Sequence, residues 1–287
     1  MGDELWVGAG LGGFALLLFL LERCFPLRRP KRPLAGRLLV NLGFAGLAFV
    51  TVLLSVRPAA VAMLGWTERS GFGLLPLPVV PDAVRPVLAF LLLDLSFYWW
   101  HRANHRLALL WRFHSVHHID PDLDVSTALR FHCVELAFSS AFRVVQIGLI
   151  APSPWAYAAY ELIFQTNTLF HHSNTRLPIR AERLLNRVLV TPRMHGIHHS
   201  QVRAETSANY ASVFPWWDRL HRTLRLNIPQ SAIEIGIPAY TRKQDNHPWH
   251  ALVMPFRRQR RYWQREDGTA PRRDATAAGE DAGRLAA

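Results

Sequence analysis

The feature that most limits how this chain can fold is a pair of long uncharged segments near its N-terminus. Leu5–Leu21 runs for seventeen residues without a charged side chain, and Leu38–Val56 runs for nineteen. A helix rises about 1.5 Å per residue, so each segment nearly crosses a hydrocarbon core roughly 30 Å thick. Half of the 287 residues are hydrophobic, which favours a membrane protein over a soluble domain with two buried helices.

The segment between these two runs, ERCFPLRRPKRPLAGR, carries six basic residues and one acidic residue. Short basic loops beside membrane spans stay on the cytoplasmic side. The sequence therefore predicts that this loop is cytoplasmic, that the N-terminus lies outside, and that the second span carries the chain outward again.

Residues 57–86 contain eight prolines and glycines. This composition opposes a regular spanning helix and predicts an external or interfacial connection. The next apolar run, Val87–Trp100, contains one acid, Asp94, and leads directly to His101. A helix running inward here would deliver His101 to the cytoplasmic edge of the bilayer.

Cys133–Phe170 is a largely apolar stretch of 38 residues with APSPWA at its middle. Its length predicts a membrane hairpin whose two helices return the chain to the side that it left. Because Glu135, Arg143 and Glu161 interrupt the apolar pattern, a re-entrant or shallow hairpin is the alternative. Together the segments predict an all-α integral membrane helical bundle of about four to five spans or re-entrant helices.

Histidines gather in one part of the chain, since 11 of the 14 lie between residues 101 and 199. They form an H-x-x-x-H pair, two H-x-x-H-H triplets and an adjacent pair. Spacings of three and four place side chains on one helix face, so each group can direct its rings at one point. The candidate ligands are His101, His105, His114, His117, His118, His171, His172, His195, His198 and His199.

One histidine pair alone is weak evidence, because histidines also cap helices and lie on solvated surfaces. Clustering and the repeated triplet favour a metal site, and ten neutral imidazoles are enough for two ions. We therefore expect a histidine-rich cap on the cytoplasmic side that holds a two-metal site.

The net charge of +12 does not predict nucleic-acid binding. Arginines lie beside the predicted spans, which suits an anionic membrane surface, and no nucleic-acid-binding motif is present. The two cysteines, Cys24 and Cys133, are too few and too far apart for a zinc ribbon or a disulfide scaffold.

Several further polar residues could support the site. Asp94 is predicted to accept a hydrogen bond from a ligand histidine, with pairing to a neighbouring helix as the alternative. His132 lies outside the triplets and is expected to support the site or the fold. The remaining polar candidates either orient ligands, pair with carboxylates or lie on a solvated surface: Arg102, Asn104, Asn174, Arg193 and Asn209.

The order of the histidine motifs resembles the fatty acid hydroxylase and sterol desaturase superfamily. So do DLSFYWWHRANH, LWRFHSVHH, DPDLDVSTALRFH, HHSN, TPRMHGIHHS and WWDRL, which together span about residues 85–225. The resemblance implies a membrane-embedded non-haem di-iron oxygenase that hydroxylates or desaturates a fatty acyl, sterol or related lipid. It implies O2 as co-substrate and electrons from a separate cytochrome b5-like or ferredoxin-type donor.

The resemblance also implies a set of ligands and a cofactor. It carries eight histidines over as ligands, with His172 as an additional one, and leaves open which of His171 and His172 binds. The cofactor implied is two iron ions, which zinc can replace in a purified form. The eight are His101, His105, His114, His117, His118, His195, His198 and His199.

This interpretation divides the chain into three parts. Residues 1–86 are the N-terminal anchor helices with their connecting loop, 87–225 the catalytic domain, and 226–287 a basic segment with a tail predicted to be disordered after Glu266. The alternative function is a non-catalytic membrane protein that binds or transports zinc or copper. Such a protein would carry His or Asp residues along a path within its spans, whereas the histidine clusters lie outside the spans.

Overall fold

The protein is all-helical over the residues that the structure, a computed structural model, describes, which are 2–273. Extended pairing within that range is limited to two isolated bridges, Pro26 with Thr175 and Ser200 with Ile235. The predicted all-α class is confirmed.

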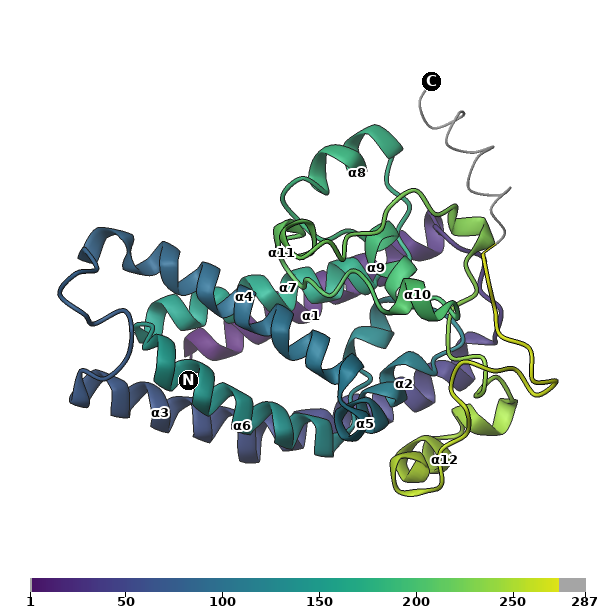
Figure 1. Cartoon of the computed structure of the whole chain (residues 1–287), viewed down its shortest axis with the longest axis horizontal. Coiled ribbons are helices and arrows are strands. Elements are labelled where there is room, and N and C mark those ends of the chain that lie inside the picture. The colour runs from purple at the N-terminus through teal and green to yellow at the C-terminus, as the bar shows by residue number, and fades with distance from the viewer. Residues whose placement is uncertain (1, 274–287) are drawn as a thin grey trace.

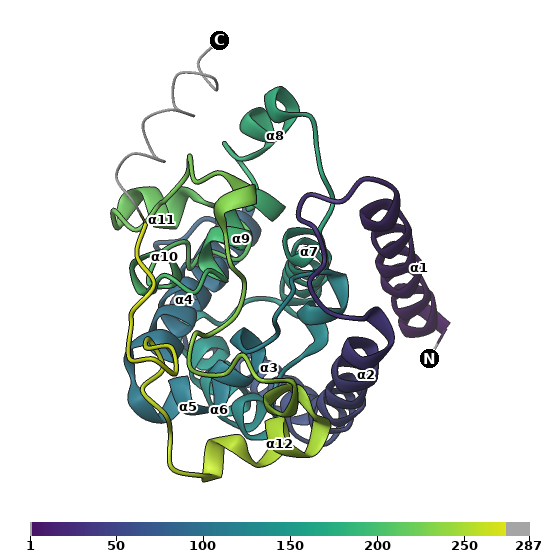
Figure 2. The ribbon, with the colours of Figure 1, turned by 90° about the vertical axis from the view of Figure 1, so that its right-hand side faces the viewer.

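Long helices form a bundle, and the shorter helices gather around one of its ends (Figures 1 and 2). The long helices are α1 (Gly2–Cys24), α2 (Leu34–Thr51), α3 (Arg57–Ser70), α4 (Arg85–Arg106), α6 (Cys133–Ile150) and α7 (Pro154–His172). The shorter ones are α5 (Ala108–His118), α8 (Ile179–Leu185), α9 (Pro192–His198), α10 (Arg203–Thr206), α11 (Trp216–Leu220) and α12 (Pro248–Val253).

Four stretches of helix are long and apolar enough to cross a membrane, namely Trp6–Cys24, Leu34–Ser70, Asp82–Arg106 and Cys133–Ile150. Their outer faces expose large apolar side chains, such as Leu54 at 73%. Water disfavours such a surface, whereas lipid does not. The helices α6 and α7 form the predicted hairpin, but α7 is not among the four stretches.

The prediction for residues 57–86 was wrong over its first half. A π-helical turn, Val52–Val56, joins α2 to α3, so residues 34–70 form one continuous helix of 37 residues. Pro58 lies in the first turn of α3, directly after this turn, and such an irregularity accommodates a proline without ending the helix. The helix ends at Gly71, whose φ of 65° is left-handed.

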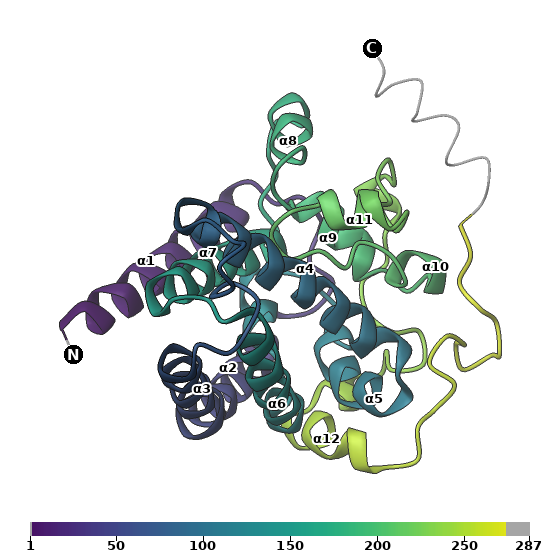
Figure 3. The ribbon, with the colours of Figure 1, turned by 60° about the vertical axis from the view of Figure 1, so that its left-hand side comes forward.

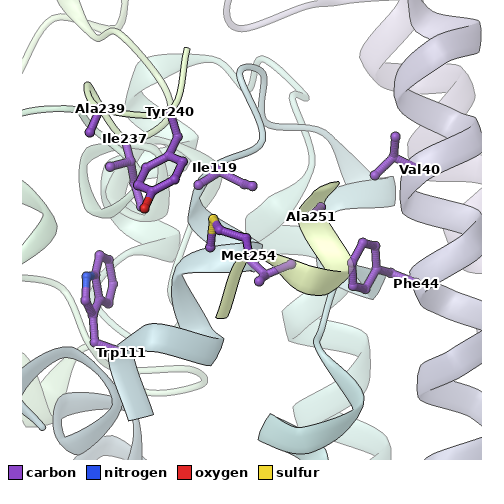
Figure 4. Packing of buried hydrophobic residues seen from close by; sticks show 10 residues of the cluster. Val40, Phe44, Trp111, Ile119, Ile237, Ala239, Tyr240, Ala251 and Met254 are labelled. Atoms are coloured by element: carbon purple, nitrogen blue, oxygen red, sulfur yellow. The ribbon is translucent and has the colours of Figure 1, made fainter. Parts of the chain in front are cut away.

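A buried apolar cluster joins the C-terminal segment to α2 and α5 (Figure 4). It comprises Val40, Phe44, Trp111, Val116, Ile119, Ile237, Ala239, Tyr240, Ala251 and Met254. The ring of Trp111 lies 4.9 Å from that of His105 and 5.4 Å from that of His118. The C-terminal segment therefore packs against the outer side of the histidine-rich region, through Trp111.

The disorder predicted after Glu266 does not begin there. Arg273 forms two hydrogen bonds, 2.8 and 2.9 Å long, with the buried carboxylate of Glu205. The rest of the predicted tail, residues 274–287, lies outside the described residues.

Candidate metal centre

Helix ends bring the candidate ligands together. The last two turns of α4 carry His101 and His105, and the chain passes through Leu107 straight into α5 (Figure 3). The other histidines come from the second half of α5, the last two residues of α7, and α9 with the residue after it. Segments up to about a hundred residues apart thus meet at one end of the bundle.

Nine of the ten candidates form two groups, and within each group the donor atoms lie within 4.8 Å of one another. The five-histidine group is His101, His105, His114, His118 and His198, and the four-histidine group is His117, His172, His195 and His199. All nine side chains are buried except His105, which is half-buried. Each group could hold a metal ion.

The expectation that each triplet points at one centre was wrong. His114 and His118 face the five-histidine group, but His117 faces the other. Successive residues are about 100° apart around a helix, so His117 is turned by that angle from His118. The second triplet divides in the same way, because His198 belongs to the five-histidine group and His195 and His199 belong to the four-histidine group. Each triplet therefore links the two groups.

Backbone carbonyls orient three of the rings. Nδ1 of His101 lies 2.7 Å from the Tyr210 oxygen, and Nδ1 of His198 lies 2.7 Å from the Ala208 oxygen. His172 makes the same contact with its own helix at 2.8 Å. A carbonyl oxygen only accepts, so Nδ1 carries the proton in each ring and the lone pair is on Nε2.

Several Nε2 atoms in the described part of the chain have no partner other than another imidazole. In the five-histidine group, Nε2 of His105, His114, His118 and His198 is buried without a hydrogen bond. In the other group, Nε2 of His172 lies 3.1 Å from that of His117 and 3.0 Å from that of His195. Two nitrogens that bind one ion at about 2.1 Å can approach this closely. The donor set therefore fits a metal.

A carboxylate orients the fourth ring. Oε1 of Glu135, on α6, accepts from Nδ1 of His114 at 2.7 Å, and both side chains are buried. Carboxylate–histidine pairs of this kind set ring orientation and ligand basicity at metal sites. Sequence reasoning had treated Glu135 only as an interruption of the hairpin. The signal that could have found it is an acid inside an apolar helical run.

Burial lowers the pKa of several of these imidazoles. Burial first, and then the neighbouring imidazoles, hold the pKa of His117 and His118 well below the usual value. Burial also lowers the pKa of His198 to about 3. Neutral imidazole is the form that binds a metal, so the rings are ready to coordinate at neutral pH.

Two further histidines lie outside the groups. Nδ1 of His171 is 3.4 Å from the Asn167 amide, and its ring packs 4.2 Å from that of His195. His132 caps α6, because its Nδ1 accepts from the Val134 N–H at 3.1 Å. The structure thus brings His172 rather than His171 into the four-histidine group.

The prediction that Asp94 accepts from a ligand histidine was wrong. Its Oδ2 accepts from the Trp217 indole at 2.7 Å and from the Phe214 N–H at 3.1 Å. Asp94 therefore ties α4 to the segment around α11, which is the alternative foreseen.

Three of the other polar candidates contact residues outside the two histidine groups, whereas the side-chain oxygen of Asn104 is buried without a hydrogen bond. Arg102 lies over the ring of Trp99, and Arg193 pairs with Glu182. Asn174 exchanges hydrogen bonds with the backbone of Arg28.

The loop at residues 208–211 supplies the two carbonyls that orient His101 and His198. Asp218 accepts from the Tyr210 and Ala211 N–H groups at 2.9 and 2.8 Å. Asn209, with a left-handed φ of 57°, donates to the Met194 carbonyl at 2.9 Å. This loop joins the first histidine pair to the second triplet.

A buried ion-pair network fixes the segment after α5. Arg37 on α2 donates to both carboxylate oxygens of Asp120, at 2.8 and 2.9 Å, and to one carboxylate oxygen of Asp124, at 2.6 Å. Asn41, one turn later, also donates to Asp120 at 2.9 Å. Because Asp120 follows His118 by two residues, the network anchors the end of α5 to the N-terminal helices.

Comparison with known proteins gives the same assignment for the central part of the chain. Residues 86–223 match the family model for fatty acid hydroxylase. The chain is 32% identical to the ornithine lipid hydroxylase OlsE of Rhizobium tropici over 185 residues, which are 63% of this chain and 53% of that protein. It is 33% identical to Homo sapiens alkylglycerol monooxygenase over 136 residues, 47% of this chain and 29% of that protein.

Mus musculus cholesterol 25-hydroxylase is 27% identical over 238 residues, which are 78% of this chain and 76% of that protein. The chain thus spans about half of the ornithine lipid hydroxylase and less than a third of the alkylglycerol monooxygenase. No solved structure matches the chain. Residues 86–223, which contain both histidine groups, thus match the fatty acid hydroxylase family.

Proposed function

We propose that this protein oxidises C–H bonds of a membrane lipid with O2 at two iron ions held by histidines. The observation that carries the proposal is the pair of adjoining, buried histidine groups at one end of a membrane-type helical bundle. Known relatives that share this region are named as hydroxylases or monooxygenases of lipids.

The five-histidine and four-histidine groups would each hold one ion, and His171 would pack beside them. When bound, the metal pair supplies the activation of O2 and the oxidation of the lipid carbon. Hydroxylation balances as R–H + O2 + 2 electrons + 2 H⁺ giving R–OH + H2O, and desaturation needs the same two electrons. The resemblance to lipid oxygenases implies that a separate carrier, cytochrome b5-like or ferredoxin-type, would supply the electrons.

The chain's own residues prepare this chemistry. Burial excludes water from the imidazoles. The carbonyls of Tyr210 and Ala208 and the carboxylate of Glu135 point Nε2 atoms at the metal positions. An apolar lipid would enter laterally from the bilayer, with its reactive carbon held beside the two groups.

The active site would face the cytoplasm. The basic loop after α1 lies at the histidine end of the bundle, because the Leu27 N–H donates to the Asn174 carbonyl two residues after α7. A loop with that positive charge is retained on the cytoplasmic side of the membrane. The charge rule and the position of the histidines therefore support one orientation.

Lipid profiles of a host with and without the gene test the proposal, together with the iron content of the purified protein. We expect an oxygenated or unsaturated lipid that disappears on deletion and returns with the wild-type gene. His117→Ala and His198→Ala should not restore it, whereas His250→Ala, which changes an exposed histidine outside both groups, should. Protein without iron and an unchanged lipid profile would exclude the oxygenase.

A further inference from the structure

A cavity lies on the outer side of α9, between α8, α9 and residues 226–230. Its volume is about 410 Å³, which is within the range of small-molecule sites. Apolar side chains such as Ile197, Leu226 and Ile228 line its wall. Four arginines also line it: Arg183, Arg187, Arg193 and Arg219. We call this cavity the α8–α9 groove.

The groove and the metal centre use opposite faces of the same short helix. Ile197 follows His195 by two positions, which turns it by about 200° around the helix. His195 belongs to the four-histidine group, whereas Ile197 and Arg193 line the groove. A molecule in the groove is therefore separated from the metal centre by the backbone of α9 and is not placed for oxidation.

Hydrogen bonds place the start of α8 at the depth where the spans end. The Arg176 N–H donates to the Phe25 carbonyl at 2.8 Å, directly after α1 ends at Cys24. Arg176 stands three residues before α8, which begins at Ile179. Since α1 is one of the candidate spans, the start of α8 would lie at the level of lipid headgroups. Figures 1 and 3 show α8 projecting beside α9 and α11.

The surface around the groove mixes exposed apolar residues with arginines. Leu184 on α8 is 63% exposed and Leu220 at the end of α11 is 68% exposed. Arg187 is exposed close by. This mixture is typical of protein surfaces that lie among headgroups and upper acyl chains, where both kinds of side chain find partners.

The charge of the groove is strongly positive. The acid that lines it, Glu182, is already paired with Arg193 at 2.6 Å. Four arginines against one acid give the lining of the groove a net positive charge. Arginine binds phosphate through paired, charge-assisted hydrogen bonds. The apolar wall suits the first carbons of an acyl chain.

We propose that the α8–α9 groove binds an anionic glycerophospholipid, with the phosphate at the arginines and the glycerol and upper acyl chain against Ile197, Leu226 and Ile228. This lipid is a bound component of the membrane rather than the substrate. The site does not depend on metal or on oxygenase activity, so its test can fail while the proposed function stands.

The probe is phosphatidylglycerol, added to the detergent-purified, metal-loaded protein, with bound lipids counted by native mass spectrometry. We expect one phosphatidylglycerol molecule to bind with much higher affinity than any further ones. Phosphatidylcholine should show no such high-affinity first binding step. Arg187→Gln removes a groove charge on an exposed residue, and Leu226→Asn removes part of the apolar wall. Each should weaken this first binding step about tenfold.

Arg180→Gln is the matched control, because Arg180 is an exposed arginine on α8 that does not line the groove. It should leave the first binding step within about twofold of wild type. Equal losses in the Arg180 and Arg187 variants would overturn the proposal in favour of diffuse surface charge. Displacement of the lipid by equimolar inorganic phosphate would show that the groove binds free anions and not specifically a lipid. If Arg187→Gln weakened the binding of an acidic redox protein but not the binding of the lipid, the groove would be assigned to that protein.

Discussion

Glu135 on α6 holds the ring of His114 on α5, with 2.7 Å between Oε1 and Nδ1. Among residues 2–273 it is the one acidic side chain that is hydrogen-bonded to a candidate ligand. The five-histidine group therefore has a carboxylate behind one of its rings, and the four-histidine group has none. This contact makes the two groups chemically different, although both consist of imidazoles.

Removing the Glu135 carboxylate should weaken metal binding in one group only. Glu135→Ala leaves the His114 Nδ1–H without its acceptor, so we expect about a 10- to 100-fold loss of affinity for one of two ions. Glu135→Gln keeps an accepting oxygen and should lose less. Chelator titration of iron- or cobalt-loaded protein measures the two affinities separately.

Glu161→Gln is the control for this experiment, because Glu161 pairs with Arg143 on the same hairpin and touches no histidine. It should leave both metal affinities unchanged. If Glu135→Ala released both ions equally, or neither, the carboxylate would have no site-specific role.

The adjacent histidines of α7 should behave differently. His172→Ala removes a member of the four-histidine group, so we expect the loss of one metal equivalent per chain. His171→Ala removes a buried ring outside both groups and should keep two equivalents while lowering stability. Elemental analysis of the two purified variants compares them directly, and a reversed result would exchange their roles.

The sequence predicts those features of this centre that are set within one helix, and not those that are set by contacts between helices. Spacings of three and four identified the histidines that α5 and α9 bring together, because helix geometry fixes them. The division of each triplet between two groups follows from packing between helices, which spacing does not encode. The presence of His172 rather than His171 in the four-histidine group also depends on how α7 faces α9.

The supports of the site were harder to predict for a physical reason. His101 and His198 are oriented by main-chain carbonyls of Tyr210 and Ala208, and every residue type carries such a carbonyl. Glu135 and Asp94 were visible as acids in apolar runs, but the partner of each depended on tertiary contacts. One contacts a ligand ring and the other binds Trp217.

Asp218 should control the loop that orients two ligands. Asp218→Asn replaces an accepting oxygen by a donating amide, so the N–H of Tyr210 or Ala211 loses its acceptor in a buried place. We expect the free energy of unfolding to fall by about 2 kcal/mol. Metal affinity should fall in the five-histidine group, which contains both oriented rings.

Asp82→Asn makes the same chemical change at a carboxylate whose side chain is 88% exposed. It should alter stability and metal affinity little. Chemical denaturation and chelator titration of the two variants separate these effects. An Asp218 variant with wild-type metal affinity would show that the loop does not position His101 and His198.

The proposed orientation predicts which loops a membrane-impermeant thiol reagent can reach. Arg29 lies in the basic loop at the histidine end, and Val79, at 81% exposure, lies in the connection between α3 and α4 at the other end. In a chain whose two native cysteines are replaced by serine, Val79→Cys should react in intact cells. Arg29→Cys should react only after permeabilisation, because the positive charge around it retains that loop inside. The reverse pattern would place the histidines on the outer face, where a cytoplasmic electron carrier has no access, and would contradict the route of electrons proposed above.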